Sequence, residues 1–251
     1  QGYICEHRGT VSTTINLTIN SNYAGDRLIR LNNGGNGNFN DVSITLQSSS
    51  RKLTIGTEAA TIGGNLIITQ GEFNTDSSNN YALTVAGLCK VYGTLTGNSS
   101  TITVGALHLD GGTYSAPDSS GSTIINDESG NQAFNNDGTF TNNGGTVTIT
   151  TAGNSQIDWI GTGSGNLNNL TYSGGAILEW TVNGGTIDGN LNITNGTLQS
   201  SNGNKALTVT GNVIVGDGTG SANTAILGNA SEEAAQTFGS LTIDSDGKYN
   251  A

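Results

Sequence analysis

The sequence predicts an all-β fold, a single-domain parallel β-solenoid (β-helix) of short strands joined by Gly- and Asn-containing turns. Three observations lead to this fold class. The composition is rich in strand and turn residues, the chain repeats internally, and its strand-like runs alternate apolar with polar residues. The length of 251 residues suits either one elongated repeat domain or two ordinary domains, so length alone does not decide.

The composition is dominated by residues of strands and tight turns. The chain contains 39 Gly, 35 Thr and 33 Asn, but one Pro and no Met. Thr, Val and Ile favour strands, whereas Gly and Asn occupy the positive-φ positions of tight turns. Charged residues make up only 11% of the chain, which argues against intrinsic disorder. We therefore expect many short strands joined by many turns.

The chain contains two long copies of one pattern. Three short segments recur in the same order and at nearly the same spacing: 64–71 with 189–196, 82–87 with 206–211, and 105–110 with 239–244. The copies span residues 63–116 and 188–250, and a variant block with the same order of strand and turn residues lies between them. A repeat of this kind is typical of a solenoid.

The strand-like runs have one buried and one polar face. Leu83 and Val85, for example, flank Thr84, and no helical pattern separates such runs, which excludes a doubly wound α/β fold. With about 20 to 25 residues and a rise of about 4.8 Å per coil, the solenoid would have about ten coils. An antiparallel β-sandwich remains the alternative, because Asn-Gly turns also form hairpins.

Residues 1–60 match the long repeat poorly, whereas residues 61–251 carry the solenoid pattern. We expect the first segment to be an N-terminal strand, a cap or an assembly segment. It contains a long regular run of alternating residues, which we interpret as a possible subunit-joining strand. The residues on one side of this strand are Val11, Thr13, Ile15, Leu17 and Ile19.

The start of the sequence predicts an exported protein, and two further features concern modifications that such a protein could carry. A Gln1 start is what signal-peptide cleavage would leave. Cys5 and Cys89 permit one disulfide, with two free thiols as the alternative. Six Asn-x-Ser/Thr sequons would allow glycosylation, although an Asn- and Thr-rich chain contains several by chance. They begin at Asn16, Asn98, Asn169, Asn192, Asn195 and Asn229.

The charge and hydropathy patterns exclude two classes of partner. The net charge is −11 and no run of Lys or Arg exists, so nucleic acids and anionic membranes would be repelled. The longest apolar stretches have four or five residues, far too few for a membrane span. We therefore expect no nucleic-acid binding and no membrane insertion.

Residues suited to catalysis are sparse. The chain has two histidines, His7 and His108, and we expect His108 to be a solvated strand residue between two inward leucines. The carboxylates between Asp110 and Asp158 come nearest to a cluster, but no constant spacing would stack them on successive coils. We expect no catalytic residue, no cofactor and no enzymatic activity.

Three further patterns point to possible ligands. The segment 244–247 begins like a calcium loop but lacks the remaining ligands, so we expect no metal site. A sugar-stacking platform would form from four aromatic residues only if they were exposed, and Trp is more often buried. The four are Trp159, Trp180, Tyr172 and Tyr114. An ice-binding array would need threonine pairs at a constant coil interval. The threonine pairs of this chain do not recur at such an interval. They are Thr101/Thr103, Thr139/Thr141 and Thr146/Thr148/Thr150.

The runs Gly-Thr-Phe-Thr-Asn-Asn-Gly-Gly-Thr-Val-Thr at 138–148 and Asn-Leu-Thr at 169–171 resemble those of repeat-rich bacterial and archaeal surface proteins. The resemblance covers residues 63–249 and is to the parallel β-helices of autotransporter passengers and filamentous-haemagglutinin-like proteins. It implies surface display, adhesion or matrix building. It transfers no catalytic residue, because the matching positions are strand and turn residues.

We therefore expect a structural subunit of an extracellular filament, matrix or cell-surface layer, secreted or at the cell surface. Because a solenoid has two open ends, its main partner would be another copy of itself, joined end to end by β-strand addition or coil stacking. The alternative is a surface adhesin or phage-fibre segment that binds glycans, which exposed Trp159 and Trp180 would favour. A polysaccharide-active enzyme is the third hypothesis.

Overall fold

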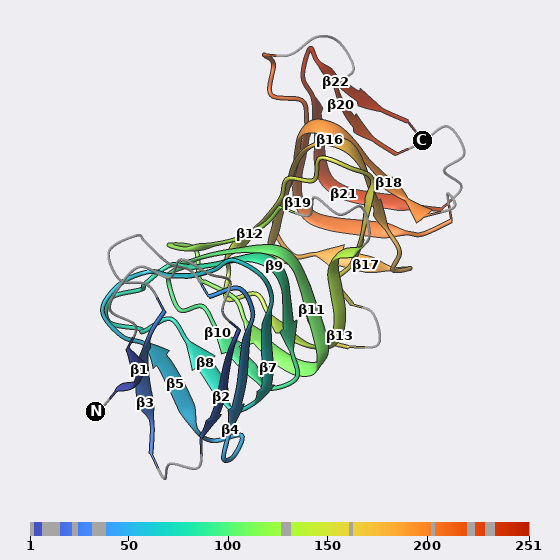
Figure 1. Cartoon of the computed structure of the whole chain (residues 1–251). Coiled ribbons are helices and arrows are strands. Elements are labelled where there is room, and N and C mark those ends of the chain that lie inside the picture. Colours follow the sequence, from blue (N-terminus) through green and yellow to red (C-terminus); the bar gives the residue numbers. More distant parts are fainter. Residues whose placement is uncertain are drawn as a thin grey trace.

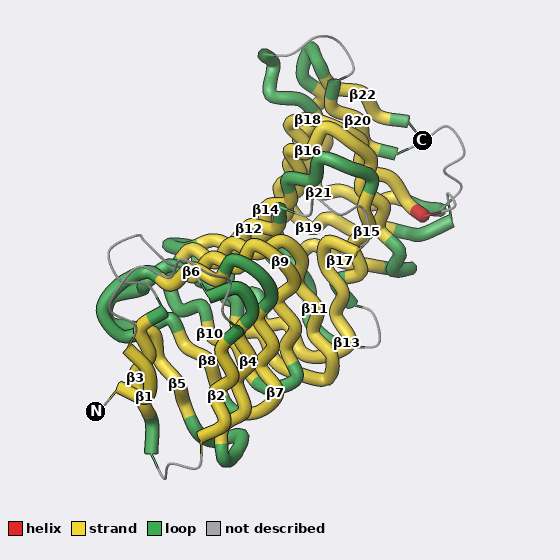
Figure 2. Tube along the Cα trace, in the orientation of Figure 1, coloured by secondary structure: helices red, strands yellow, loops and turns green. Residues whose placement is uncertain are grey.

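The computed structural model shows an all-β parallel solenoid of about 9 turns. The structure describes residues 3–6, 16–21, 25–31, 39–126, 132–160, 163–201, 204–219, 224–228 and 234–250. The two termini lie at opposite ends of the stack (Figure 1). Strands and loops make up nearly all of the described chain (Figure 2). The predicted fold class is confirmed.

The strands are short except where one continues around a corner of the coil. In the first half they are β1 (Tyr3–Glu6), β2 (Leu17–Ser21), β3 (Arg27–Arg30), β4 (Val42–Leu46), β5 (Lys52–Ile55), β6 (Ala60–Ile62), β7 (Leu66–Gln70), β8 (Glu72–Asn74), β9 (Leu83–Val91), β10 (Thr94–Thr96) and β11 (Thr101–Ser115). In the second half they are β12 (Ser122–Ile125), β13 (Gln132–Thr141), β14 (Thr146–Ile149), β15 (Ser155–Asp158), β16 (Asn169–Trp180), β17 (Gly185–Ile187), β18 (Leu191–Ser200), β19 (Leu207–Val215), β20 (Ala225–Leu227), β21 (Gln236–Ile243) and β22 (Gly247–Tyr249).

The strand pairings define three faces, which the chain visits in a fixed order. Face 1 comprises β2, β4, β7, β15, β20, β22, the second parts of β9, β16 and β18, the middle of β11 and the first part of β13. Face 2 comprises β1, β3, β5, β8, β10, β17, the ends of β11 and β13, and the starts of β19 and β21. Face 3 comprises β6, β12, β14, the starts of β9, β11, β16 and β18, and the ends of β19 and β21.

All of these pairings are parallel, so the antiparallel sandwich is excluded. Parallel neighbouring strands in register place residues at equivalent positions directly above one another. In each strand every second side chain points inward. One inward stack on face 1 is fully buried. It consists of Val42, Leu66, Cys89, Leu107, Phe134, Ile157 and Trp180. This stacking explains the alternation of apolar and polar residues that predicted the fold.

One polar residue interrupts the inward stack of face 3. Thr123 lies between Ile102 and Val147 and is buried. Its Oγ1 lies 2.7 Å from the hydroxyl of Tyr114, which is also fully buried. The two hydroxyls satisfy each other, so the core contains this polar pair without an unpaired group.

Side-chain amides and carboxylates bind the backbone of the next coil at the corners. Asp41 Oδ1 accepts a hydrogen bond from Asn65 N at 2.8 Å, and Asn65 Oδ1 accepts one from Leu88 N at 2.9 Å. In the second half, Asn169 and Asn190 each accept a bond from the backbone N–H of a later coil, at 2.9 Å. Corner N–H groups, which fall outside the strand ladder, thus obtain partners.

The two long repeat copies lie on different faces. Residues 64–69 are at the start of face 1, but their counterparts at 189–194 are at the start of face 3. Likewise, 82–87 belong to face 3 and 206–211 to face 2. The distance between the copies is therefore not a whole number of coils. The structural unit that the sequence repeats is therefore one strand with its corner. This unit can lie on any of the three faces.

Coil length varies widely while the register is kept. Leu66, Cys89, Leu107 and Phe134 are successive members of the inward stack on face 1, yet the sequence intervals between them are unequal. The additional residues of the longer coils are accommodated in the corners and turns, because the paired strands themselves remain aligned. The described strands of residues 1–60 join the same stack, since β1 pairs with β3 and β2 pairs with β4.

We expect Gly105→Ala to destabilise the protein. A Cβ at Gly105 would lie 2.5 Å from the backbone oxygen of Ala86 in the coil below, and the rigid backbone there restricts relaxation. Overpacking of this kind costs about 1–3 kcal/mol. The measurement is the urea unfolding midpoint, with Gly175→Ala as the control, because nothing lies within 4 Å of a Cβ there. Equal midpoints for the two variants would contradict the close packing at Gly105.

Candidate functional site

The N-terminal strand that we interpreted as subunit-joining is only partly described. Leu17 and Ile19 lie in β2, where Ile19 is buried and Leu17 is half-buried. Val11, Thr13 and Ile15 lie outside the described residues. Among the strands that the structure describes, β2 pairs with β4 alone, so no described strand satisfies the backbone donors and acceptors of its other edge.

The C-terminal end of face 3 exposes residues that belong in the core. Leu241 and Ile243 pair with Val213 and Val215, which are completely buried. Leu241 is nevertheless 37% exposed and Ile243 48% exposed. No described strand follows β21 on this face, so the inward side chains of this rung have a neighbour on one side only. The sequence analysis missed these two residues, because their alternation is that of ordinary core positions.

The structure holds no Cys5–Cys89 disulfide, because Cys89 carries a free thiol. Cys89 is fully buried in the inward stack of face 1, and burial raises the pKa of its thiol to about 12. Cys5 lies in β1, at least three rungs from the rung of Cys89. Three rungs correspond to about 14 Å along the axis, and a disulfide needs Cα atoms within about 7 Å.

The aromatic residues considered as a sugar-stacking platform are all in the core. Trp159 and Trp180 are each 1% exposed, and their indole N–H groups donate to the backbone oxygens of Thr186 and Lys205 at 3.2 and 3.0 Å. Tyr114 and Tyr172 are buried too. The platform therefore does not form from these residues.

Face 1 carries an ionic group on its outer side. Lys90 Nζ lies 2.9 Å from Asp110 Oδ2 and 4.9 Å from the ring centre of Tyr92. Asp110 and Asp137 occupy the same register position on adjacent coils. The expectation that no carboxylates stack on successive coils is wrong for this pair, because an unequal coil length still gives an aligned register.

This arrangement is poorly suited to acid–base catalysis of glycoside hydrolysis. The hydrogen bond from Lys90 lowers the pKa of Asp110, whereas a general acid needs a raised pKa. His108 points outward as predicted, and its Nε2 lies 3.2 Å from the backbone oxygen of Gln132. Within the described ranges, no group of three or more His, Cys, Asp or Glu is placed to hold a metal ion.

The loop considered for calcium is occupied by internal hydrogen bonds. The carboxylate of Asp246 accepts bonds from Gly218 N at 2.8 Å, from Asp217 N at 3.3 Å and from the Thr224 hydroxyl at 3.3 Å. These bonds lower the pKa of Asp246, and the bond from the backbone N–H of Gly218 has the largest effect. The Asp246 side chain therefore connects this loop to the residues after β19.

The asparagines of the six sequons differ in accessibility: Asn16 and Asn195 are exposed, Asn98, Asn169 and Asn192 are half-buried, and Asn229 lies outside the described residues. The Nδ2 atom, to which a glycan would be attached, already donates two hydrogen bonds in Asn98. Asn16 and Asn195 are thus the better placed acceptors.

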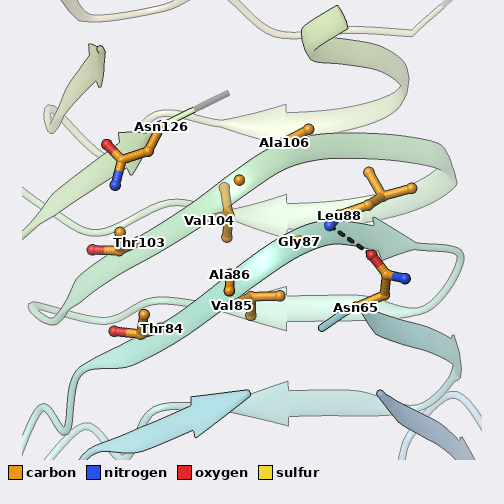
Figure 3. Close-up of a pocket in the computed structure, with 11 residues that line it drawn as sticks. Asn65, Thr84, Val85, Ala86, Gly87, Leu88, Thr103, Val104, Ala106 and Asn126 are labelled. Carbon is orange, nitrogen blue, oxygen red and sulfur yellow. Dashed lines mark hydrogen bonds between the residues drawn. The ribbon is translucent and has the colours of Figure 1, made fainter. Parts of the chain in front are cut away.

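A shallow depression of about 610 Å³ lies on the outer surface where faces 3 and 1 meet (Figure 3). It exists because Ala86, Gly87, Gly105 and Ala106 have little or no side chain. Thr84 and Thr103 stand side by side along it, on β9 and β11. No lining residue is titratable, so the depression offers no acid or base.

The fold and the repeated strand unit define the class of the protein as a parallel β-solenoid repeat protein. In the part of the chain that the structure describes, no helix is long and apolar enough to cross a bilayer. No family model, curated protein or solved structure matches the chain.

We expect Cys89 to be inert toward thiol reagents in the native protein. In a Cys5→Ser variant, the reagent should react only after denaturation, because the thiol is buried and protonated. Because the folded pKa lies above the ordinary value of 9.0, the stability that the protonated thiol contributes is complete below pH 9.0 and decreases as the pH rises toward 12. Rapid labelling in native buffer would show that Cys89 is accessible.

Proposed function

We propose that the chain is a structural subunit of an extracellular filament, matrix or cell-surface layer, whose copies join end to end by coil stacking. The observation that carries this proposal is the uncovered C-terminal rung of face 3, where Leu241 and Ile243 are 37% and 48% exposed. Their counterparts in the preceding coil are completely buried. Burial of such side chains by another coil is favourable, at about 25 cal/mol per Å² of apolar surface.

The backbone of the end rungs supports the same contact. A terminal strand has a row of N–H and C=O groups without partners, and a further parallel strand satisfies them. In the described chain, β1 and β2 lie at one end and β21 and β22 at the other, each paired on one edge. All of the described strands are parallel, so a second copy placed on either end continues the ladder without reversal.

The first and last segments of the sequence differ in net charge in the sense that favours head-to-tail joining. Residues 1–60 contain five basic and four acidic residues, a net charge of +1, although the whole chain carries −11. Residues 201–251 contain two basic and five acidic residues, a net charge of −3. A head-to-tail contact between unlike ends propagates into a filament when its rotation does not close into a ring, and stacking along the coil axis is a contact of this kind.

A glycan-binding adhesin is the second hypothesis. Exposed tryptophans would have favoured it, but the structure does not show them. Trp159 and Trp180 are buried, so a glycan would have to bind elsewhere on the surface. The C-terminal end of the described stack, by contrast, offers the exposed side chains of Leu241 and Ile243 on a strand that pairs with a described strand on one edge. We therefore place assembly ahead of adhesion.

We expect Leu241→Lys to abolish end-to-end assembly, because it places a charge at the centre of the stacked contact. The matched control is Ile67→Lys, since Ile67 is also 37% exposed but lies on the outer side of face 1. Filament length in negative-stain electron microscopy and the sedimentation coefficient are the measurements. Short rods in the wild type, or filaments of equal length in both variants, would refute coil stacking at this end.

Deletion of residues 1–20 separates the two modes of joining. If the N-terminal strand that contains Leu17 and Ile19 is donated to the next subunit, the deleted protein should remain as short rods in the same micrographs. If coils stack on β21 and β22, the deletion exposes β4 as a new end rung and filaments persist. Filaments from the deleted protein would therefore contradict strand donation while leaving coil stacking in place.

A further inference from the structure

One outward column runs without interruption along face 3. At each coil the central residue that points outward pairs directly with its equivalent in the next coil. Eight of its nine members are the β-branched residues Thr or Ile. The face-3 column consists of Thr61, Thr84, Thr103, Ile124, Thr148, Thr171, Asn192, Ile214 and Thr242. With about 4.8 Å per step, it is about 38 Å long.

The column could not be predicted from the sequence because its members are unevenly spaced along the chain. The step from Thr84 to Thr103 is shorter along the chain than the step from Ile124 to Thr148, yet each is a single step of the column. The threonine pairs at 101/103 and 146/148 both lie on face 3, while the pair 139/141 lies on face 2. The pairs recur at no constant interval, as expected, but the fold still aligns Thr103 and Thr148 in one column, with Ile124 between them.

The hydroxyls of this column are not used by the protein. None of its six threonines makes a side-chain hydrogen bond within the described residues, unlike the corner residues Asn65, Asn169 and Asn190. β-branched side chains are also restricted at χ1, so their hydroxyl and methyl groups are held in place by the backbone. Figure 3 shows Thr84 and Thr103 pointing the same way from adjacent strands. The column therefore presents a regular, rigid array of unengaged hydroxyls and methyls.

The described strands of face 3 are uncharged in a protein whose net charge is −11. None of its described strand segments contains Asp, Glu, Lys, Arg or His. The outer sides of the other faces differ: face 1 carries Lys90 and Asp110, and face 2 carries the ion pair of Lys52 with Glu72 at 3.4 Å. The absence of charge excludes partners that bind through charge, such as nucleic acids and anionic lipids.

The partner of such a face should itself be uncharged and periodic. Two kinds of solid meet this condition, ice and a crystalline polysaccharide. Polysaccharide chains are recognised by aromatic rings that lie on the sugar faces. The column contains no aromatic residue, and the aromatic side chain of face 3, Tyr172, is buried. Water, in contrast, hydrogen-bonds to hydroxyl groups, and the column supplies threonine hydroxyls on coils about 4.8 Å apart.

We propose that the face-3 column is an ice-binding surface, on which regularly spaced threonine hydroxyls and methyls hold water in an order that merges with an ice lattice. Face 2 has a shorter threonine array at Thr94, Thr113 and Thr139, but this array continues into Lys52 and Glu72. Face 3 is therefore the better surface, because its column is longer and no charge interrupts it.

The test uses the double variant Thr103→Tyr/Thr148→Tyr, which places two bulky rings in the middle of the column. Tyrosine is a good strand residue, so the fold should be retained, and circular dichroism melting verifies this. The matched control is His108→Tyr, because His108 lies on the same strand as Thr103 but on face 1. The measurements are thermal hysteresis, crystal shaping and incorporation of the labelled protein into a growing ice hemisphere.

We expect the wild type and His108→Tyr to shape ice and enter it, and the double variant to lose both activities. Absence of hysteresis and of ice incorporation in the wild type would overturn the proposal, as would equal activity in the folded double variant. A parallel pull-down on microcrystalline cellulose and chitin covers the competing solid. Retention there that the double variant removes, without any effect on ice, would replace the ice-binding assignment with a polysaccharide-binding one.

Discussion

The whole structure depends on the parallel, in-register stacking of strands from successive coils. This stacking satisfies the backbone donors and acceptors of each rung and at the same time forms continuous inward stacks such as that from Val42 to Trp180. Because each coil is covered by its two neighbours, no single coil has a core of its own. Stability is therefore cooperative along the axis, and the rungs at the ends are the weak points.

The unit of this solenoid is one strand with its corner. The displacement of the second repeat copy by one face shows that Gly-Asn-Leu segments serve equally well at the start of face 1 and of face 3. The faces have nevertheless diverged on their outer sides. Face 1 carries the Lys90–Asp110 ion pair, whereas face 3 carries the uncharged threonine column. The chemistry of outward residues can differ from face to face because the buried core is formed by inward residues.

The ends and the faces of the rod therefore have separate properties. Leu241 and Ile243 are exposed because no described coil covers them. The face-3 column lies on the outer side of that face along its described strands. It does not depend on whether the ends of the solenoid join to other copies. End-to-end joining would lengthen the column in each filament, so the two proposals are compatible, although neither requires the other.

The fold class could be predicted from the sequence, because alternation as at Leu83, Thr84 and Val85 and the abundance of Gly and Asn are local properties of strands and turns. The sequence also predicted that His108 points outward. Tertiary structure alone decided which residues share a column, since coils of unequal length keep one register by absorbing the difference in their corners. The same holds for the pairing of Asp110 with Asp137, for the free thiol of Cys89 and for the exposure of Leu241. Each of these depends on distances between coils, and the linear spacing of residues does not contain those distances.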